Sequence, residues 1–400
     1  MDFDPGLRRS HDNSPFTSIP ILDLSLASPS GSPESRTQFR SQLRHALTDV
    51  GFLYITNHGV ASTVISDLVG ILPELFALPS ETKSSDLALV NTPHFLGYSA
   101  LGAETTAGNR DSREQFEFAT ELPANPSFTC ASAADNEEAS QEFQVPLYER
   151  LKGPNQWPDE AKHAGLAGFR TMMERYTAEM TALGKRFLKL VAEALDLPEE
   201  TFFSFLSEQH RLKIVRYPPA SGTQNNNNKE EEFIQGVGPH KDSSGWWTFL
   251  LQASPPHVKG LQVLNKSGQW IDVPVIEGSF VVNIGQAFEV VTQGVCKATT
   301  HRVVLSTLQK QERFSVPFFQ GVRAHLTRSE AVDTLKMHFA SWVKKDAEGS
   351  KENEVDSPFL RGKYDTWGES QLRTKIRSHR DVGKRWYPDV YEQYVGDDNK

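Results

Sequence analysis

The stretch GVGPHKDSSGWWTFLLQ, residues 236–252, decides the fold, and THRVV at residues 300–304 complements it. His240 and Asp242 stand two positions apart, so on an extended strand both side chains leave the same face. An HxD pair alone is a weak signal, because most histidines lie in a core or on a surface rather than on a metal. Two imidazoles and one carboxylate together form a ligand set that holds Fe(II) and leaves coordination positions open. With His301 as the second imidazole, these three residues predict a metal site.

A basic residue with a hydroxyl neighbour follows the second histidine. In ERFSVPFF, residues 312–319, Arg313 and Ser315 stand two apart and share one face of a predicted strand. A guanidinium beside a hydroxyl is the geometry that holds a carboxylate through two hydrogen bonds. The pair therefore predicts an anchor for the far end of a dicarboxylate that chelates the metal.

These motifs belong to a longer ordered series. It comprises IPILDLS, GFLYITNHGV and FALPSETK in the N-terminal half, and GVGPHKD, WTFLLQ, GLQVL, GQWIDVPVIEGSFVVNIG, THRVV and RFSVPFF in the C-terminal half. In order and spacing the series resembles the Fe(II)- and 2-oxoglutarate-dependent dioxygenases of the isopenicillin N synthase-like superfamily, over nearly the whole chain. The resemblance implies an α+β fold, in which helices, one of them long, brace a double-stranded β-helix (jelly-roll) barrel.

The resemblance also implies the chemistry of the site. Fe(II) is expected on the two histidines and the aspartate, with 2-oxoglutarate and O2 as co-substrates. Arg313, Ser315 and Tyr217 are the expected contacts of 2-oxoglutarate. The expected reaction couples oxidative decarboxylation of 2-oxoglutarate to hydroxylation, desaturation or cyclisation of an amino acid or small specialised metabolite. A metal-binding scaffold without turnover is the alternative from another class.

Two departures from the family pattern affect the 2-oxoglutarate contacts. Arg216 precedes Tyr217 where many relatives carry asparagine, and the two side chains fall on opposite faces of one strand. The interval from His301 to Arg313 is longer than usual, which predicts an extended hairpin between their strands. A register shift of one residue there would turn Arg313 outward.

The substrate is the open question at this stage. The strings GYSALGAETTAG, VRYPP and RWYPD resemble stretches of ethylene-forming enzymes, which use arginine as a co-substrate. Ethylene formation from 2-oxoglutarate is therefore an alternative to ordinary oxidation. The candidate substrate residues are Glu104, Thr106, Arg216, Trp246 and Arg385. A solvated loop carboxylate is an equal interpretation of Glu104, and a cation at a packed helix end is an equal interpretation of Arg385.

Composition narrows the class of protein. The chain has 400 residues, of which 38% are hydrophobic, and this is enough for a sizeable core. A net charge of −9 argues against a nucleic-acid partner. Two cysteines, Cys130 and Cys296, fit a reducing compartment. With no long apolar run, we expect a cytoplasmic enzyme that acts on a small molecule and binds no membrane. A monomer is a separate expectation, and the oligomeric state is open at this stage.

Pattern and composition divide the chain into five segments. They are a flexible N-terminus (1–17), an N-terminal dioxygenase segment (18–120), an acidic insertion with the long bracing helix (121–205), the jelly-roll core that binds Fe(II) and 2-oxoglutarate (206–325) and a C-terminal helical extension (326–400). Apolar residues at helical spacing over 159–195 predict the bracing helix. The polar stretches 131–144 and 221–232 predict mobile loops.

Overall fold

The structure is a computed structural model. It describes residues 15–28, 31–106, 108–124, 145–219, 232–243, 245–342, 357, 359–360 and 364–396. Cys130, the acidic stretch 131–144 and nearly all of the Asn-rich run 221–232 lie outside the described residues, as does most of the expected flexible N-terminus.

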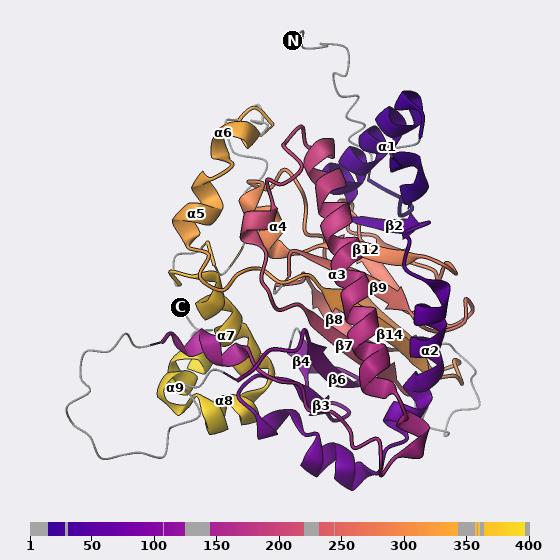
Figure 1. The fold of residues 1–400 in the computed structure, drawn as a ribbon, viewed down its shortest axis with the longest axis vertical. Helices are drawn as coiled ribbons and strands as arrows, with labels where there is room; N and C mark the ends of the chain where they lie inside the picture. Colours follow the sequence, from indigo (N-terminus) through magenta and orange to yellow (C-terminus); the bar gives the residue numbers. More distant parts are fainter. Residues whose placement is uncertain are drawn as a thin grey trace, which may run out of the picture.

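Two β-sheets form the centre of the fold (Figure 1). The larger has the strand order β1-β2-β12-β9-β14-β7-β6-β3 and the smaller the order β11-β10-β13-β8. In chain order the strands are β1 (Ile21–Asp23), β2 (Phe52–Thr56), β3 (Gly97–Ser99), β4 (Thr105–Thr106), β5 (Asn109–Arg110), β6 (Glu114–Ala119), β7 (Arg211–Tyr217), β8 (Phe233–His240), β9 (Trp247–Gln252), β10 (Leu261–Leu264), β11 (Trp270–Asp272), β12 (Phe280–Ile284), β13 (His301–Ser306) and β14 (Arg313–Phe319). Two sheets braced by helices confirm the predicted α+β jelly roll.

Helices cover the outer face of the larger sheet (Figure 1). The longest, α3 (Phe169–Ala194), packs beside α1 (Pro33–His45) and α2 (Ser62–Phe76). Its apolar stripe reaches the sheet, where the ring of Phe187 lies 5.7 Å from that of Phe249. The predicted helix over 159–195 begins later than expected, because Gly168 precedes it in a left-handed conformation, with φ of 79°.

Alternation along β6 and β7 gives the larger sheet two different faces. On β7, Leu212 and Ile214 enter the apolar core below the helices, whereas Lys213 and Tyr217 point to the opposite face. On β6, Phe116 enters the same core. Because successive residues of a strand face opposite sides, a single strand supplies both the core and the polar interior of the barrel.

The C-terminal extension closes one side of the molecule. Its helices are α5 (Arg328–Asp333), α6 (Lys336–Phe339), α7 (Trp367–Ser378), α8 (Arg380–Trp386) and α9 (Pro388–Gly396). The short helix α4 (Gln286–Val291) lies outside this extension, directly after β12. Thr366 and Glu369 cap the start of α7 reciprocally, so its first turn is fixed. None of the helices in the described parts of the chain is long and apolar enough to span a bilayer.

The five-segment division stays a prediction. Strands from the expected N-terminal segment, β1, β2, β3 and β6, join strands of the expected core in one sheet. The two segments therefore share a hydrogen-bonded framework, and contacts between them contribute to the site.

Candidate active site

His240, Asp242 and His301 meet at one end of the smaller sheet. His240 ends β8, His301 begins β13, and the two residues pair directly across these strands. Their ring centroids lie 4.3 Å apart. Nε2 of each imidazole lies 3.6 Å from Oδ1 of Asp242, and all three candidate ligand atoms lie within 4.8 Å of one another. The arrangement matches the two-histidine, one-carboxylate ligand set of non-haem Fe(II) enzymes.

Hydrogen bonds to the backbone orient both imidazoles so that their Nε2 atoms face the candidate metal position. Nδ1 of His240 lies 2.8 Å from the Gly238 carbonyl oxygen, and Nδ1 of His301 lies 3.1 Å from the Thr299 carbonyl oxygen. A carbonyl oxygen accepts only, so each Nδ1 carries the proton and each Nε2 presents its lone pair. Burial lowers the pKa of His301 to about 4, which keeps this imidazole neutral at physiological pH.

The carboxylate is held in a matching way. Oδ2 of Asp242 accepts hydrogen bonds from Oγ1 of Thr248 on β9 and from Nδ2 of Asn283 on β12, which leaves Oδ1 facing the imidazoles. Burial alone would raise the pKa of Asp242, but the two histidines and the threonine hydroxyl lower it below its usual value. The aspartate is therefore ionised, as a metal ligand must be.

Arg313 and Ser315 lie on β14 and face the same cavity as the three candidate ligands. Arg313 is 2% exposed, and its guanidinium lies 4.9 Å from the ring centroid of Tyr217, its cross-strand partner on β7. Its Nη2 lies 3.5 Å from Oε1 of Gln252, and among the described residues its Nη1 has no hydrogen-bond partner. A buried guanidinium with a free donor needs an anion, so the residues fit a dicarboxylate.

The long interval between His301 and Arg313 does not turn the arginine outward. β13 ends at Ser306 and β14 begins at Arg313, so the additional residues of this interval lie in the turn between the two strands. Arg313 then pairs with Tyr217, and Ser315 with Val215, in regular antiparallel register. The anchor strand therefore presents Arg313 to the cavity.

One cavity of about 440 Å³ contains all of these groups. The three candidate ligands, the arginine and the tyrosine line one part of it, and charged side chains from β6, β7 and α7 line another. Glu104 and Thr106, two of the candidate substrate residues, belong to this lining. Thr106 also donates to Asp111 at 2.8 Å.

Trp246 is not a cavity residue, which corrects the expectation from the sequence. It is fully buried in the apolar core, where its ring stacks on Phe205 with centroids 5.4 Å apart. Phe288 also contacts it, from α4. The tryptophan stands just before β9 and points toward the helices, so it supports the sheet from behind.

Arg216 and Arg385 also lie away from the cavity. Arg216 alternates with Tyr217 on β7 and points to the other face, where it forms ion pairs with Glu114 and Glu312. Arg385 is exposed on α8, and its guanidinium lies 5.3 Å from the ring of the neighbouring Trp386. The expectation that these two residues contact the substrate is therefore wrong. Arg216 lies on the other face of its strand because side chains alternate along β7, and Arg385 lies on the outward face of α8.

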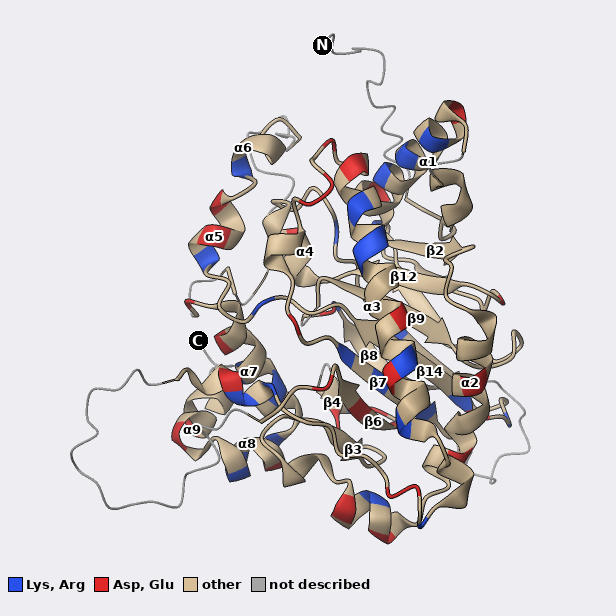
Figure 2. Cartoon of the chain, viewed as in Figure 1, with Lys and Arg blue, Asp and Glu red and all other residues tan. Residues whose placement is uncertain are grey.

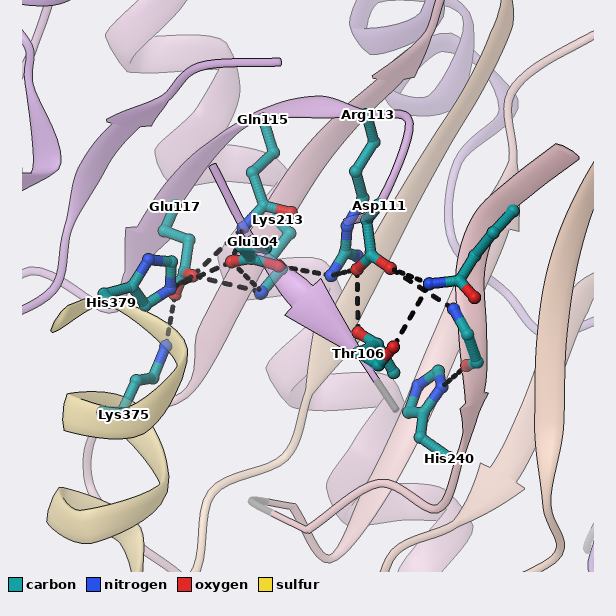
Figure 3. A network of polar contacts seen from close by, with 12 residues as sticks. Glu104, Thr106, Asp111, Arg113, Gln115, Glu117, Lys213, His240, Lys375 and His379 are labelled. Atoms are coloured by element: carbon teal, nitrogen blue, oxygen red, sulfur yellow. Dashed lines mark hydrogen bonds and ion pairs between the residues drawn. The ribbon is translucent and has the colours of Figure 1, made fainter. Parts of the chain in front are cut away.

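Apart from Glu104, the sequence reasoning missed a network of buried charges that lines another part of the cavity (Figure 3). We call these residues the charged wall: Glu104, Asp111, Arg113, Glu117, Arg211, Lys213, Lys375 and His379. Nε2 of His379 lies 2.9 Å from Glu104, and Nζ of Lys375 lies 2.5 Å from Glu117. Lys213 contacts Glu117 at 3.1 Å, and Arg113 contacts both Glu104 and Asp111.

The charged wall left a readable signal on its strands. Polar and apolar residues alternate from Gln115 to Phe118 on β6 and from Arg211 to Ile214 on β7, which is the pattern of a strand with one polar face. The pairing of Glu117 with Lys213 follows once these strands are neighbours. No local pattern places Lys375 and His379 beside them, because α7 (yellow in Figure 1) and the residue that follows it are distant in the sequence from β6 and β7. Figure 2 shows the lysine and arginine residues of α7 in blue.

Neighbouring charges determine the ionisation of the wall. Burial alone would raise the pKa of Glu104, but Arg113, Lys213 and His379 hold it well below its usual value. The same balance, with Lys213 and Lys375 as the main partners, holds the pKa of Glu117 well below its usual value. Both carboxylates are therefore charged although both are buried.

Comparison with known proteins places these features in a family. Residues 19–160 match the family model of the non-haem dioxygenase in morphine synthesis N-terminal region, and residues 209–322 match that of the 2OG-Fe(II) oxygenase superfamily. A 2-oxoglutarate-dependent dioxygenase, frbJ, of Dothideomycetidae sp. (strain 11243) is 41% identical over 380 residues, which cover 94% of each chain.

More distant relatives and a solved structure agree with this match. A homoarginine-6-hydroxylase of Glycine max is 28% identical, covering 80% of this chain and 90% of its own. A 1-aminocyclopropane-1-carboxylate oxidase of Dictyostelium mucoroides is 26% identical, covering 75% and 81%. The crystal structure of a 2OG-Fe(II) oxygenase family protein of Caulobacter crescentus has the same fold, with a TM-score of 0.62, 22% identity and coverage of 90% and 99%.

Proposed function

Because the chain belongs to the 2OG-Fe(II) oxygenase superfamily, we propose that His240, Asp242 and His301 hold its Fe(II) and that Arg313 and Ser315 hold its 2-oxoglutarate. The protein is a non-haem Fe(II)- and 2-oxoglutarate-dependent oxygenase that uses O2. The observation that carries the residue assignment is the free Nη1 of buried Arg313 in the cavity of the three candidate ligands.

When bound, Fe(II) supplies the coupling between oxidative decarboxylation of 2-oxoglutarate to succinate and CO2 and oxidation of the primary substrate. The protein's own groups hold the reactants. Thr248 and Asn283 fix the aspartate oxygen that does not face the imidazoles. Arg313 and Ser315 hold the distal carboxylate, and the Tyr217 ring supports the guanidinium. This assignment orients 2-oxoglutarate with its other end toward the three ligands.

We further propose an amino acid as the class of the primary substrate. The names of the Glycine max and Dictyostelium relatives both specify amino acids, homoarginine and 1-aminocyclopropane-1-carboxylate. A cavity with charged side chains from three elements suits a small zwitterion better than an apolar metabolite, because such a ligand replaces the hydrogen bonds that water would make. Hydroxylation, desaturation and cyclisation are all open to such a substrate.

Ethylene formation is the second candidate, and the resemblance in the sequence favours it. Of the residues expected around arginine, Glu104 and Thr106 reach the cavity, whereas Arg216 and Arg385 do not. Both oxygens of Glu104 already accept from the protein, through Arg113 on one and His379 on the other. An assay for ethylene with and without L-arginine decides between the candidates.

The test of the residue assignment is Asp242→Ala. We expect iron-dependent succinate production from 2-oxoglutarate to fall to background, because two imidazoles alone hold Fe(II) weakly. A scaffold without turnover would produce no succinate even in the unchanged protein. The matched control is Asp272→Ala, which removes an exposed carboxylate from β11. Loss of activity in both variants, or in neither, would contradict the assignment.

A cytoplasmic location, a monomeric state and the absence of a nucleic-acid partner stay proposals. Cys296 is a free, fully buried thiol, which supports a reducing compartment. A size-exclusion measurement of the full-length chain tests the monomer directly.

A further inference from the structure

The charged wall forms the part of the cavity where β6, β7 and α7 meet (Figure 3). Glu104 and Glu117 form its centre, and five cationic or protonatable side chains line the cavity around them: Arg113, Arg211, Lys213, Lys375 and His379. The oxygens of the two glutamates and Nε2 of His379 lie close enough together to hold a metal ion. However, the surrounding ammonium and guanidinium groups already occupy those oxygens, which excludes a cation there.

The wall carries more positive than negative charge. Four lysine and arginine side chains face three carboxylates, one of which, Asp111, lies behind the surface of the cavity. Glu104 and Glu117 raise the pKa of His379 despite its burial, which adds further positive charge. Two other lysines of the lining, Lys152 and Lys241, have glutamate partners of their own. An uncompensated buried charge is costly, so the excess calls for an anion.

The Fe(II) end of the cavity does not supply that anion. In the proposed function, the two charges of Fe(II) and the charge of Arg313 are balanced by Asp242 and the two carboxylates of 2-oxoglutarate. The loaded end is thus neutral, and none of the described residues balances the excess positive charge of the wall. The missing anion therefore belongs to the primary substrate.

Lys375 is the group best placed to receive it. Its ammonium carries three N–H donors, and the structure gives it one hydrogen-bond partner among the described residues, Glu117. Burial, partly opposed by Glu117, lowers the pKa of Lys375 to about 8, as expected for a cation that lacks enough anionic partners. Gln371, on the same helix, donates to the Ser243 carbonyl oxygen at 2.7 Å, so α7 is held beside the segment that follows Asp242.

We propose that the charged wall binds a carboxylate group of the primary substrate and that Lys375 donates a hydrogen bond directly to it. The proposal rests on the proposed function, because that assignment places 2-oxoglutarate at Arg313 and leaves the wall to the second reactant. It makes Lys375 a specificity residue for substrates that carry a carboxylate, such as an amino acid. Glu104 and Glu117 hold the cations of the wall in position.

The test uses the full-length chain, loaded anaerobically with Fe(II) and saturating 2-oxoglutarate so that an added carboxylate cannot occupy the Arg313 position. Butyrate and butyramide, which match in size and differ in charge, are titrated at constant ionic strength while the unfolding temperature is measured. We expect saturable stabilisation by butyrate and none by butyramide. Lys375→Met should raise the butyrate concentration needed for half-maximal stabilisation about tenfold or more. Lys375→Arg should bring that concentration most of the way back to the wild-type value.

Two further variants separate binding from structure. Lys384→Met removes an exposed ammonium that lies over Tyr391 on the same extension, and it should leave the butyrate titration unchanged. Glu117→Gln removes one negative charge from the wall, so it should destabilise the protein and yet strengthen butyrate binding. A merely structural role for the wall predicts weaker binding in that variant. The Glu117→Gln and Lys375→Arg proteins decide the matter if Lys375→Met does not fold.

Equal stabilisation by butyrate and butyramide, no stabilisation by either, or an unchanged titration in Lys375→Met would overturn the proposal. Failure of the proposed function has a different signature, because the visible band of the complex between Fe(II) and 2-oxoglutarate would then not form. In that case the butyrate titration is repeated without Fe(II) and 2-oxoglutarate. Arg313→Met is added to each protein so that butyrate cannot bind at Arg313, and comparison with the Lys375 variants still shows whether butyrate binds at Lys375.

Discussion

Arg313 connects burial and chemistry at the scale of the single residue. It is nearly inaccessible, its charge lies over the Tyr217 ring, and its Nη1 lacks a partner among the described residues. Such a residue is costly in the empty protein and gains most from a carboxylate. The pair formed by Arg313 and Ser315 was predictable because both residues fall within one short strand.

We expect Arg313→Met to raise the KM for 2-oxoglutarate by about 10- to 150-fold, the range that the loss of a hydrogen bond to a charged group implies. Arg313→Lys keeps the charge but loses the planar guanidinium with its two parallel N–H donors. Its KM for 2-oxoglutarate should therefore lie between those of wild type and Arg313→Met. Succinate formation against 2-oxoglutarate concentration measures both. Arg170→Met, on an exposed face of α3, is the control, and an unchanged KM in Arg313→Met would remove the anchor assignment.

His379 makes the stability of the protein depend on pH. Burial would lower the pKa of this imidazole, but Glu104 and Glu117 outweigh it and raise the pKa above the usual 6.5. A raised pKa in the folded state stabilises the protein below pH 6.5, and this contribution is lost as the pH rises through the folded pKa. Each unit of elevation corresponds to about 1.4 kcal/mol.

His379→Gln should therefore reduce the free energy of unfolding more at pH 6 than at pH 9. Denaturant unfolding of the metal-free protein at both values gives the difference between the two proteins. Lys375, with a pKa near 8, titrates in wild type and variant alike, so comparison of the two proteins at each pH is essential. A difference that stays constant between pH 6 and 9 would show that His379 contributes packing alone.

At the scale of elements, Asp111 joins the segment before β6 to the strand that carries His240. Its Oδ1 accepts from the Gly238 amide at 3.3 Å and from Gln235 at 3.0 Å. The Gly238 carbonyl oxygen in turn holds Nδ1 of His240. Asp111 therefore positions a candidate metal ligand through the backbone, although it comes from the other half of the chain.

We expect Asp111→Ala to weaken Fe(II) affinity by about tenfold or more, as is typical when a group behind a metal ligand is lost. An anaerobic Fe(II) titration measures the affinity, and the KM for 2-oxoglutarate should change less. Asp381→Ala, on exposed α8, is the control. If Fe(II) affinity is unchanged and only stability falls, Asp111 is a structural clamp without effect on the metal.

Sequence reasoning identified candidate residues that lie close together on one strand. It failed for residues that come together only when several elements pack against one another. The pair of His240 and Asp242 and the pair of Arg313 and Ser315 were visible because each lies within a few residues of one strand, whereas His301 comes from a separate strand-like run that the family resemblance joins to them. The charged wall needs β6 paired with β7 and α7 packed against both, and no short pattern encodes that meeting. Trp246 was misplaced for a related reason, since its face of the sheet depends on where β9 begins.

At the scale of the whole molecule, α3 holds the larger sheet from behind. Phe187 is fully buried, and its ring meets those of Trp247 and Phe249 at 5.5 and 5.7 Å. Thr248, which donates to Asp242, lies between them on β9 and faces the other side. The apolar core and the candidate metal site are therefore two faces of the same strand.

Phe187→Ala should lower the free energy of unfolding by about 3–5 kcal/mol through the cavity it leaves. The KM for 2-oxoglutarate should stay close to that of wild type at low temperature, because the strand keeps its hydrogen bonds on both edges. Denaturant unfolding and succinate assays at 10 °C check the two parts. Equal losses of stability and affinity would mean that the core and the site do not separate in this way.

The most direct test of the Fe(II) and 2-oxoglutarate site is an anaerobic titration of the Fe(II)-loaded chain with 2-oxoglutarate, followed through the weak visible charge-transfer band. Wild type should develop the band and saturate, Arg313→Met should need far more 2-oxoglutarate, and Asp242→Ala should show no band. A band that is absent in wild type, or that saturates identically in Arg313→Met, would contradict the assignment of the triad and the anchor to one site.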